Sequence, residues 1–186
     1  MKEQVNPALN KADNDLVSEI KNGQKEAFNE IFQRYQKKIF SFLYYLTQNK
    51  DTAEDLSQNA FLNAYKAISA WNGTGSFKNW LYKIAYREAL GYWKKQKRNL
   101  EIFTDEGELP DMADDAEDID IQLGNREILE KALSQLPIIY RTVLLLRYFN
   151  ELSYEEIAES AKLPLNTVRT HLRRAKIALE KELKKL

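Results

Sequence analysis

The stretch LPLNTVRTHLRRAKIAL, residues 163–179, predicts a helix with an apolar face and a basic face. Its apolar series has spacings of four, three and four, at Val168, Leu172, Ala175 and Leu179. In a helix of about 3.6 residues per turn these side chains lie on one side and are expected to be buried. Taken alone, the stretch is either a helix that binds a negatively charged partner or an ordinary basic surface helix.

The residues before this stretch favour a negatively charged partner. Ser153 and Glu156 have the Ser-x-x-Glu spacing of a capping box, which starts a helix that can run only to about Ala161. Pro164 suits the first turn of a second helix. Two helices with a tight break between them are typical of a helix-turn-helix, whose second helix enters the major groove of DNA.

Arginine suits such a helix because its planar fork can bind a guanine edge or a phosphate. We expect Arg169 and Arg173 to point into the groove, with Arg174 and Lys176 nearer the phosphates. The full set expected to contact DNA here is Asn166, Thr167, Arg169, Thr170, Arg173, Arg174 and Lys176. The single histidine, His171, is expected to be a surface or backbone-contacting residue, and we expect no metal site.

Charge is unevenly distributed along the chain. It has 28 basic and 28 acidic residues, but ten of the acidic ones lie between Glu101 and Asp120, where no lysine or arginine occurs. Because such a run repels itself and buries little, we expect an extended linker. The rest of the chain then carries a net charge of +10, so the neutral total does not argue against nucleic acid as a partner.

Apolar residues recur with a helical period through most of the chain, and no segment alternates with period two for long enough to suggest a sheet. We therefore predict an all-α protein with two small helical domains, 10–98 and 124–186, joined by an acidic flexible linker, 99–123. The C-terminal domain contains the helix-turn-helix. The absence of cysteine, signal peptide and membrane span predicts a cytoplasmic protein that is not membrane-embedded.

Three helices are predicted in the first domain. Asp51 is a candidate N-cap with Glu54 three residues on, and Ser76 can cap a later helix. The earliest helix is expected to bury Phe28, Ile31, Phe32, Tyr35, Ile39, Phe42, Leu43 and Leu46. The last is expected to bury Phe77, Trp80, Leu81 and Ile84.

Two polar surfaces are predicted on these helices. The segment KIAYREALGYWKKQKRN, residues 83–99, mixes cations with aromatic rings, which suits single-stranded nucleic acid because rings stack on unpaired bases. Alternatively, the rings are core and the cations form a solvated face. Asp51, Glu54, Asp55 and Gln58 form an acidic and polar strip at helical spacing, which is either solvated or docks a basic protein surface.

Three segments resemble the extracytoplasmic-function sigma factors of bacterial RNA polymerase: DTAEDLSQNAFLNAYKAI (51–68), SFKNWLYKIAYREALGYWKKQKR (76–98) and LPIIYRTVLLLRYFNELSYEEIAESAKLPLNTVRTHLRRAKIALEKEL (136–183). The resemblance implies that the first binds the polymerase clamp helices and the second recognises and opens the minus-ten promoter element. The third would read the minus-thirty-five element and pack on the polymerase flap. The sequence departs from the family pattern at Asn59, Arg87, Gly91 and Asn166.

The resemblance also implies site residues and partners. Polymerase-binding residues are expected to be Asp51, Glu54, Asp55, Gln58 and Asn59. Minus-ten contacts are expected from Trp71, Asn72, Ser76, Lys78, Asn79, Lys83, Tyr86, Arg87, Lys94 and Lys95, with an unpaired base captured in the loop 71–76. The linker would thread the polymerase cleft, and an anti-sigma factor would hide the polymerase-binding surfaces.

We therefore expect a sigma factor whose partners are core RNA polymerase, promoter DNA and an anti-sigma factor. No catalytic constellation is recognisable, so we expect no enzyme activity, cofactor or small-molecule substrate. Two alternatives remain at this stage. A stand-alone helix-turn-helix regulator would bind a palindrome as a dimer. A helical adaptor that binds only protein would tolerate loss of Arg169, Arg173 and Arg174.

Overall fold

The computed structural model describes residues 11–73, 75–95 and 126–186, and every regular element in these ranges is a helix. The predicted all-α fold is thereby confirmed. Contacts between residues divide the chain into two compact units, with the boundary between Leu90 and Gly91. The predicted linker, 99–123, lies outside the described residues, so the domain limits of 10–98 and 124–186 stay predictions.

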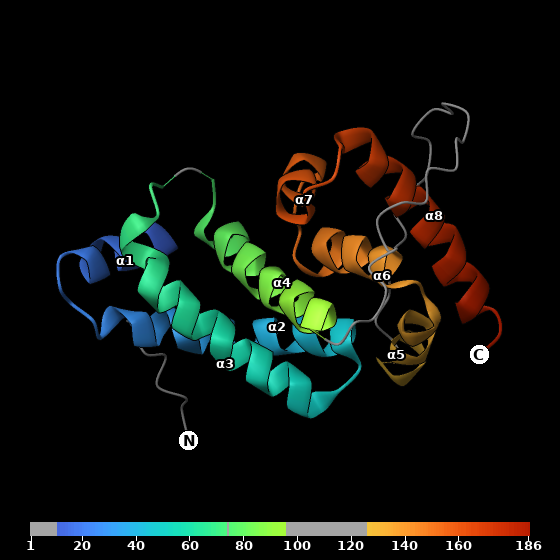
Figure 1. The fold of residues 1–186 in the computed structure, drawn as a ribbon, viewed down its shortest axis with the longest axis horizontal. Helices are drawn as coiled ribbons and strands as arrows, with labels where there is room; N and C mark the ends of the chain where they lie inside the picture. The colour runs from blue at the N-terminus through green and yellow to red at the C-terminus, as the bar shows by residue number, and fades with distance from the viewer. Residues whose placement is uncertain (1–10, 74, 96–125) are drawn as a thin grey trace, which may run out of the picture. The chain divides into compact units, whose positions relative to one another are not determined.

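The N-terminal unit contains α1 (Asp13–Lys21), α2 (Ala27–Thr47), α3 (Lys50–Ala67), the short 3-10 helix η2 (Ile68–Ala70) and most of α4 (Phe77–Lys95), whose last residues lie beyond the boundary (Figure 1). The long helices α2 and α3 pack along each other, and α1 contacts both α2 and η2. The centre of α2 supplies the fully buried side chains Ile31, Ile39 and Leu43. Burial of this apolar face is the main stabilising contribution to the unit.

The α2–α3 connection is a tight turn. Gln48 ends α2 in a left-handed conformation, and Asn49 is the N-cap of α3 because its side-chain oxygen accepts a hydrogen bond of 2.8 Å from the Thr52 N–H. The prediction of Asp51 as the N-cap is therefore wrong by two residues. Asp51 instead lies in the first turn, where a negative charge interacts favourably with the helix dipole.

Helix α4 starts as predicted, and Phe77 and Leu81 are buried as expected, but the rest of its buried face differs. The Ser76 hydroxyl accepts from the Asn79 N–H at 3.1 Å, which confirms the cap. Trp80 and Ile84, predicted to be buried, are only half-buried, whereas Tyr82 and Tyr86 are 1 % exposed. The face differs because the tyrosine side of α4 meets the core, where Tyr82 lies edge-on to Phe42 with ring centroids 5.3 Å apart.

The C-terminal unit contains α5 (Arg126–Gln135), α6 (Ile138–Leu144), the π-helical segment η4 (Leu145–Phe149), α7 (Tyr154–Ala161) and α8 (Leu165–Leu183) (Figure 1). Helix α8 packs against α5, α6 and α7, so it is the centre of the unit. Burial lowers the pKa of Arg141 to about 10, and its guanidinium donates to the Ser134 and Leu136 carbonyls, at 2.9 and 3.1 Å, at the end of α5. These bonds satisfy carbonyls that a helix end leaves without partners.

The helix-turn-helix has the predicted local structure. The Ser153 hydroxyl accepts from the Glu156 N–H at 3.2 Å, and the Glu156 carboxylate accepts from the Ser153 N–H at 2.8 Å, which completes the capping box. Helix α7 ends at Ala161, followed by Lys162 in a left-handed conformation. Pro164 is the N-cap of α8. Across the described ranges, none of the helices has the length and apolarity that crossing a bilayer requires.

Candidate nucleic-acid and protein interfaces

The apolar series of α8 is buried as its spacing predicts. Val168, Leu172, Ala175 and Leu179 are all buried, whereas Asn166 and Arg169 are exposed. The remaining residues predicted to contact DNA, apart from Lys176, are half-buried: Thr167, Thr170, Arg173 and Arg174. Because the apolar side is covered by α5, α6 and α7, the side that contains Arg169 is the one open to a partner.

Arg169 also faces the preceding helix. The pKa of Glu155 is lowered, first by its own backbone N–H, then by the Ser153 hydroxyl, and to a smaller extent by the charge of Arg169. The carboxylate of α7 and the guanidinium of α8 are thus electrostatic neighbours across the turn.

Lys176 and His171 are core residues of the C-terminal unit. Lys176 is 7 % exposed, and the outward orientation predicted for it is wrong. His171 is 2 % exposed, with its ring centroid 5.9 Å from that of Tyr140, so the surface position considered for it is also wrong. Both errors have one cause: α8 packs against three helices, so its buried arc is wider than its apolar stripe.

The loop before α4 combines exposed polar residues with a buried tryptophan. Asn72 and Ser76 are exposed, and Gly73 and Gly75 have φ of 82° and 74°. Such positive φ values suit glycine because it lacks a Cβ. Trp71, predicted to contact DNA, is buried against Phe77 and Trp80 with ring centroids 5.6 and 6.4 Å away. In the described part of this loop, the structure therefore exposes Asn72 and Ser76, and not the Trp71 ring.

The cations of α4 share a face. Lys83, Arg87 and Lys94 follow each other at spacings of four and seven, which places them on one side of the helix. Arg87, Lys94 and Lys95 are exposed, and Lys78, Asn79 and Lys83 are half-buried. Tyr86, predicted to contact DNA, is buried in the core and is not available to stack on a base. For this ring the alternative interpretation, an aromatic core beside a solvated basic face, is the correct one.

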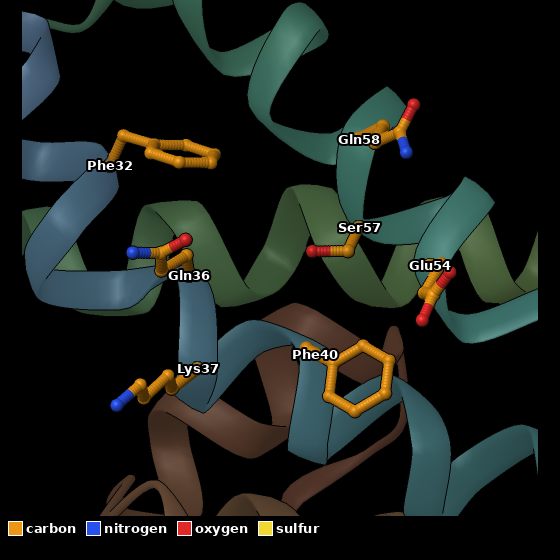
Figure 2. Close-up of a pocket in the computed structure, with 7 residues that line it drawn as sticks. All are labelled: Phe32, Gln36, Lys37, Phe40, Glu54, Ser57 and Gln58. Carbon is orange, nitrogen blue, oxygen red and sulfur yellow. The ribbon is translucent and has the colours of Figure 1, made fainter. Parts of the chain in front are cut away.

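The acidic and polar strip of α3 is exposed. Its predicted members are Asp51, Glu54, Asp55 and Gln58, and Asn59, the other residue expected to bind polymerase, is exposed beside them. Glu54, Gln58 and Ser57 line a hollow of about 290 Å³ whose other wall is α2, with Phe32, Gln36, Lys37 and Phe40 (Figure 2). The strip is thus one side of a surface formed by two helices, and the sequence pattern indicated only the α3 side.

This surface also has an apolar component, part of which the sequence pattern predicted to be buried. Phe32, predicted to be buried, is 40 % exposed and lies edge-on to Phe61 with centroids 4.9 Å apart. Leu62 and Tyr65 on α3 are also exposed. Exposed apolar side chains on two neighbouring helices, here Leu62 and Tyr65 on α3 and Phe32 on α2, are typical of a protein-binding surface.

Family comparisons match two separate parts of the chain, one for each helical region. Residues 31–99 match the model of sigma-70 region 2, and residues 126–179 match that of sigma-70 region 4. The chain belongs to the sigma-70 family.

Its relatives place it among the extracytoplasmic-function sigma factors. It is 33 % identical to the ECF RNA polymerase sigma factor SigW of Bacillus subtilis, over 91 % of this chain and 96 % of the relative. It is 32 % identical to the ECF RNA polymerase sigma-E factor of Escherichia coli, over 94 % and 95 %.

Solved structures of similar fold agree with the family assignment. The sigma factor RpoE of Bartonella quintana, in complex with the anti-sigma factor NepR, superposes with a TM-score of 0.65 at 23 % identity, covering 84 % of this chain and 96 % of that one. CnrH, in complex with the cytosolic domain of CnrY, superposes with a TM-score of 0.67 at 18 % identity, covering 94 % and 99 %. In this sigma factor, region 2 corresponds to α2–α4 and region 4 to α5–α8.

Proposed function

We propose that this sigma factor directs promoter-specific initiation through three separate surfaces: the α2–α3 hollow for core polymerase, the loop 71–76 with α4 for the minus-ten element, and α8 for the minus-thirty-five element. The observation that supports this division most directly is the separation of charge. The exposed acidic strip lies near the start of α3, where the exposed Lys50 is its cationic neighbour on the same helix, whereas the exposed residues Arg87, Lys94 and Lys95 lie on α4 and Arg169 on α8. One chain with an acidic protein-binding surface and basic DNA-binding surfaces suits a bridge between an enzyme and its template.

Polymerase binding is assigned to Asp51, Glu54, Asp55, Gln58 and Asn59, together with the α2 wall of the hollow. A basic helical element of the partner would suit this surface because Glu54 lines the hollow, the exposed Asp51 and Asp55 lie on the same helix, and Phe32 and Phe40 offer apolar surface. Such a combination gives both electrostatic steering and buried apolar area. By family membership, the element is the polymerase clamp helices.

Minus-ten recognition is assigned to the exposed loop and the cationic face of α4. The residues are Asn72, Ser76, Lys78, Asn79, Lys83, Arg87, Lys94 and Lys95. Cations would follow the phosphates of an opened strand, while the loop backbone and Asn72 would bind the edge of an unpaired base. Trp71 and Tyr86 are left out as direct contacts because both are buried.

Minus-thirty-five recognition is assigned to α8. Arg169 and Arg173 would reach base edges, Arg174 a phosphate, and Asn166, Thr167 and Thr170 the groove around the start of the helix. Thr170 already donates to the Asn166 carbonyl at 3.0 Å, so its hydroxyl oxygen remains an acceptor toward DNA. Lys176 is left out because it lies in the core.

We further propose that the protein has no enzyme activity or cofactor of its own and works on polymerase in the cytoplasm. An anti-sigma factor is proposed as its regulator, since the similar RpoE structure is a complex with one. Such a regulator would cover the α2–α3 hollow and compete with polymerase. The rival functions, a stand-alone dimeric regulator and a protein-only adaptor, predict respectively tight palindrome binding without polymerase and no DNA dependence at all.

The test is reconstitution. The purified chain is mixed with bacterial core polymerase, the complex is isolated, and transcription is measured from a library of randomised promoters. We expect a stable complex and initiation from promoters that share two elements. Initiation by core polymerase without the chain at the same promoters, or palindrome binding by the free chain, would refute the proposal.

A further inference from the structure

The start of the loop 71–76 is held by a residue far away in the sequence. The ammonium of Lys21, the last residue of α1, donates a hydrogen bond of 2.5 Å to the backbone carbonyl of Trp71. Fifty residues separate the two groups. The contact fits the packing of the unit, in which α1 lies against η2, the short helix that leads into the loop (Figure 1).

Helix α1 is itself fixed to the core. Its first residue, Asp13, accepts hydrogen bonds from the Arg34 guanidinium and, at 2.5 Å, from the Tyr35 hydroxyl, both on α2. Leu16 and Val17 of α1 are buried. The position of Lys21 therefore derives from α2, the central helix of the unit, through α1. A charge-assisted hydrogen bond from such a residue restrains the position of its acceptor, the Trp71 carbonyl, because the helix that carries the donor is already ordered.

A contact from outside the loop is important for its conformation because two of its residues are glycines, which restrict the backbone little. Gly73 and Gly75 lie between its ends, and a Cβ at either position would meet no atom within 4 Å. Neither glycine is thus held by packing around it. At the far end, the Ser76 hydroxyl caps α4. Together with the buried Trp71 ring, the Lys21 and Ser76 contacts set where the chain enters and leaves the loop.

We propose that Lys21 is a positioning residue for minus-ten recognition: through the Trp71 carbonyl it fixes the backbone at the start of the loop, next to Asn72, and so helps to determine which unpaired base binds there. This inference rests on the proposed role of the loop. Lys21 does not need to touch DNA, because it acts on the backbone that carries Asn72. Base selectivity, more than overall affinity, should therefore depend on it.

The experiment uses the holoenzyme, reconstituted from core polymerase and the full chain. Dissociation constants are measured for single-stranded oligonucleotides that cover the minus-ten element, with each of the four bases at each position. Lys21→Met removes the donor but keeps the length of the side chain, and Lys21→Arg retains a donor. Lys25→Met is the matched control, since Lys25 is exposed in the connection between α1 and α2 and has the same charge.

We expect Lys21→Met to change the affinity ratio between preferred and disfavoured bases at one position by about threefold to tenfold, as for loss of one hydrogen bond. Lys21→Arg should keep the wild-type ratio, and Lys25→Met should behave as wild type. Affinity for core polymerase and the thermal unfolding midpoint should change little. Lys21→Ala, which also lacks a donor, replaces the methionine variant if that variant is unstable.

Three results would overturn the inference. An unchanged base ratio in Lys21→Met would show that the start of the loop keeps its position without the contact. A uniform loss for all oligonucleotides with a weaker salt dependence would show that Lys21 binds a phosphate directly. Equal defects in the arginine and methionine variants would show that no hydrogen bond is needed. If the wild-type holoenzyme itself shows no base preference, the proposed function of the loop is refuted. The inference about Lys21, which rests on that function, is then refuted as well.

Discussion

The ammonium of Lys176 lies 5.6 Å from the centroid of the Tyr148 ring, inside the C-terminal unit. A cation over an aromatic face at this distance is attracted by the ring, and the attraction grows as water is excluded. Lys176 therefore contacts η4, the π-helical segment that contains Tyr148, although it lies among the cations of α8. Its neighbour Arg174 has a different environment, and the two cations should behave differently.

Lys176→Ala should lower the free energy of unfolding of the C-terminal unit by about 1–2 kcal/mol, through the lost cation–π contact and stem packing. Chemical denaturation of the full chain, followed by a probe in this unit, measures the loss. Promoter affinity at permissive temperature should keep its wild-type salt dependence. Arg174→Ala should instead reduce the salt slope by about one contact. A reduced salt slope in Lys176→Ala would return this residue to the DNA-binding set.

Arg173→Ala should weaken transcription from promoters that need the upstream element while core binding stays normal. Loss of a base-edge arginine costs about 1–3 kcal/mol and relaxes sequence preference at one position. Arg169→Ala should have the same kind of effect at a different position. Competitive transcription from a library randomised upstream measures both. Unchanged selectivity and salt slope in Arg169→Ala, Arg173→Ala and Arg174→Ala would mean that α8 is only a solvated basic face.

Asp55→Arg should weaken binding to core polymerase without unfolding the N-terminal unit, because Asp55 is exposed and lies off the buried residues Ala53, Leu56 and Ala60. Reversing one charge in a desolvated complementary interface costs about 2–5 kcal/mol. Affinity for core is measured by fluorescence anisotropy of labelled sigma factor. Asp15→Arg, a reversal at an exposed position on α1 outside the hollow, is the control. Equal affinities for the two folded variants would refute the docking surface.

Glu155→Gln should make the stability of the C-terminal unit less dependent on pH in acid. The pKa of Glu155 is lowered below its ordinary value of 4.5, mainly by its own backbone N–H and then by Ser153. A carboxyl group with a lowered folded-state pKa stabilises the fold above its unfolded pKa and loses this contribution as the pH falls through the folded value. Denaturation curves at pH 7 and at several pH values below 4.5 measure the effect, with Glu180→Gln on exposed α8 surface as control. Parallel pH profiles for wild type and Glu155→Gln would contradict this prediction.

Local interactions made much of this protein predictable. The capping box at Ser153 and Glu156, the Ser76 cap and the apolar series from Val168 to Leu179 depend on residues within a few turns of one helix, so their spacing was enough to predict them. The resemblance of region 2 and region 4 segments likewise required only contiguous residues. All-α class, helix-turn-helix and sigma-factor family were therefore accessible from the sequence.

Tertiary packing decided which face of each helix is open. Lys176, Tyr86 and Trp71 were expected to contact DNA and are buried, whereas Phe32 was expected in the core and is exposed. Each of these outcomes depends on which neighbouring helices cover the residue, and a helical period describes one helix at a time. The Lys21–Trp71 contact joins groups fifty residues apart, and no local spacing encodes it. The sequence by itself determined the helices and the family. The long-range burial of helix faces, driven by removal of apolar surface from water, determined which side chains remain for polymerase and promoter.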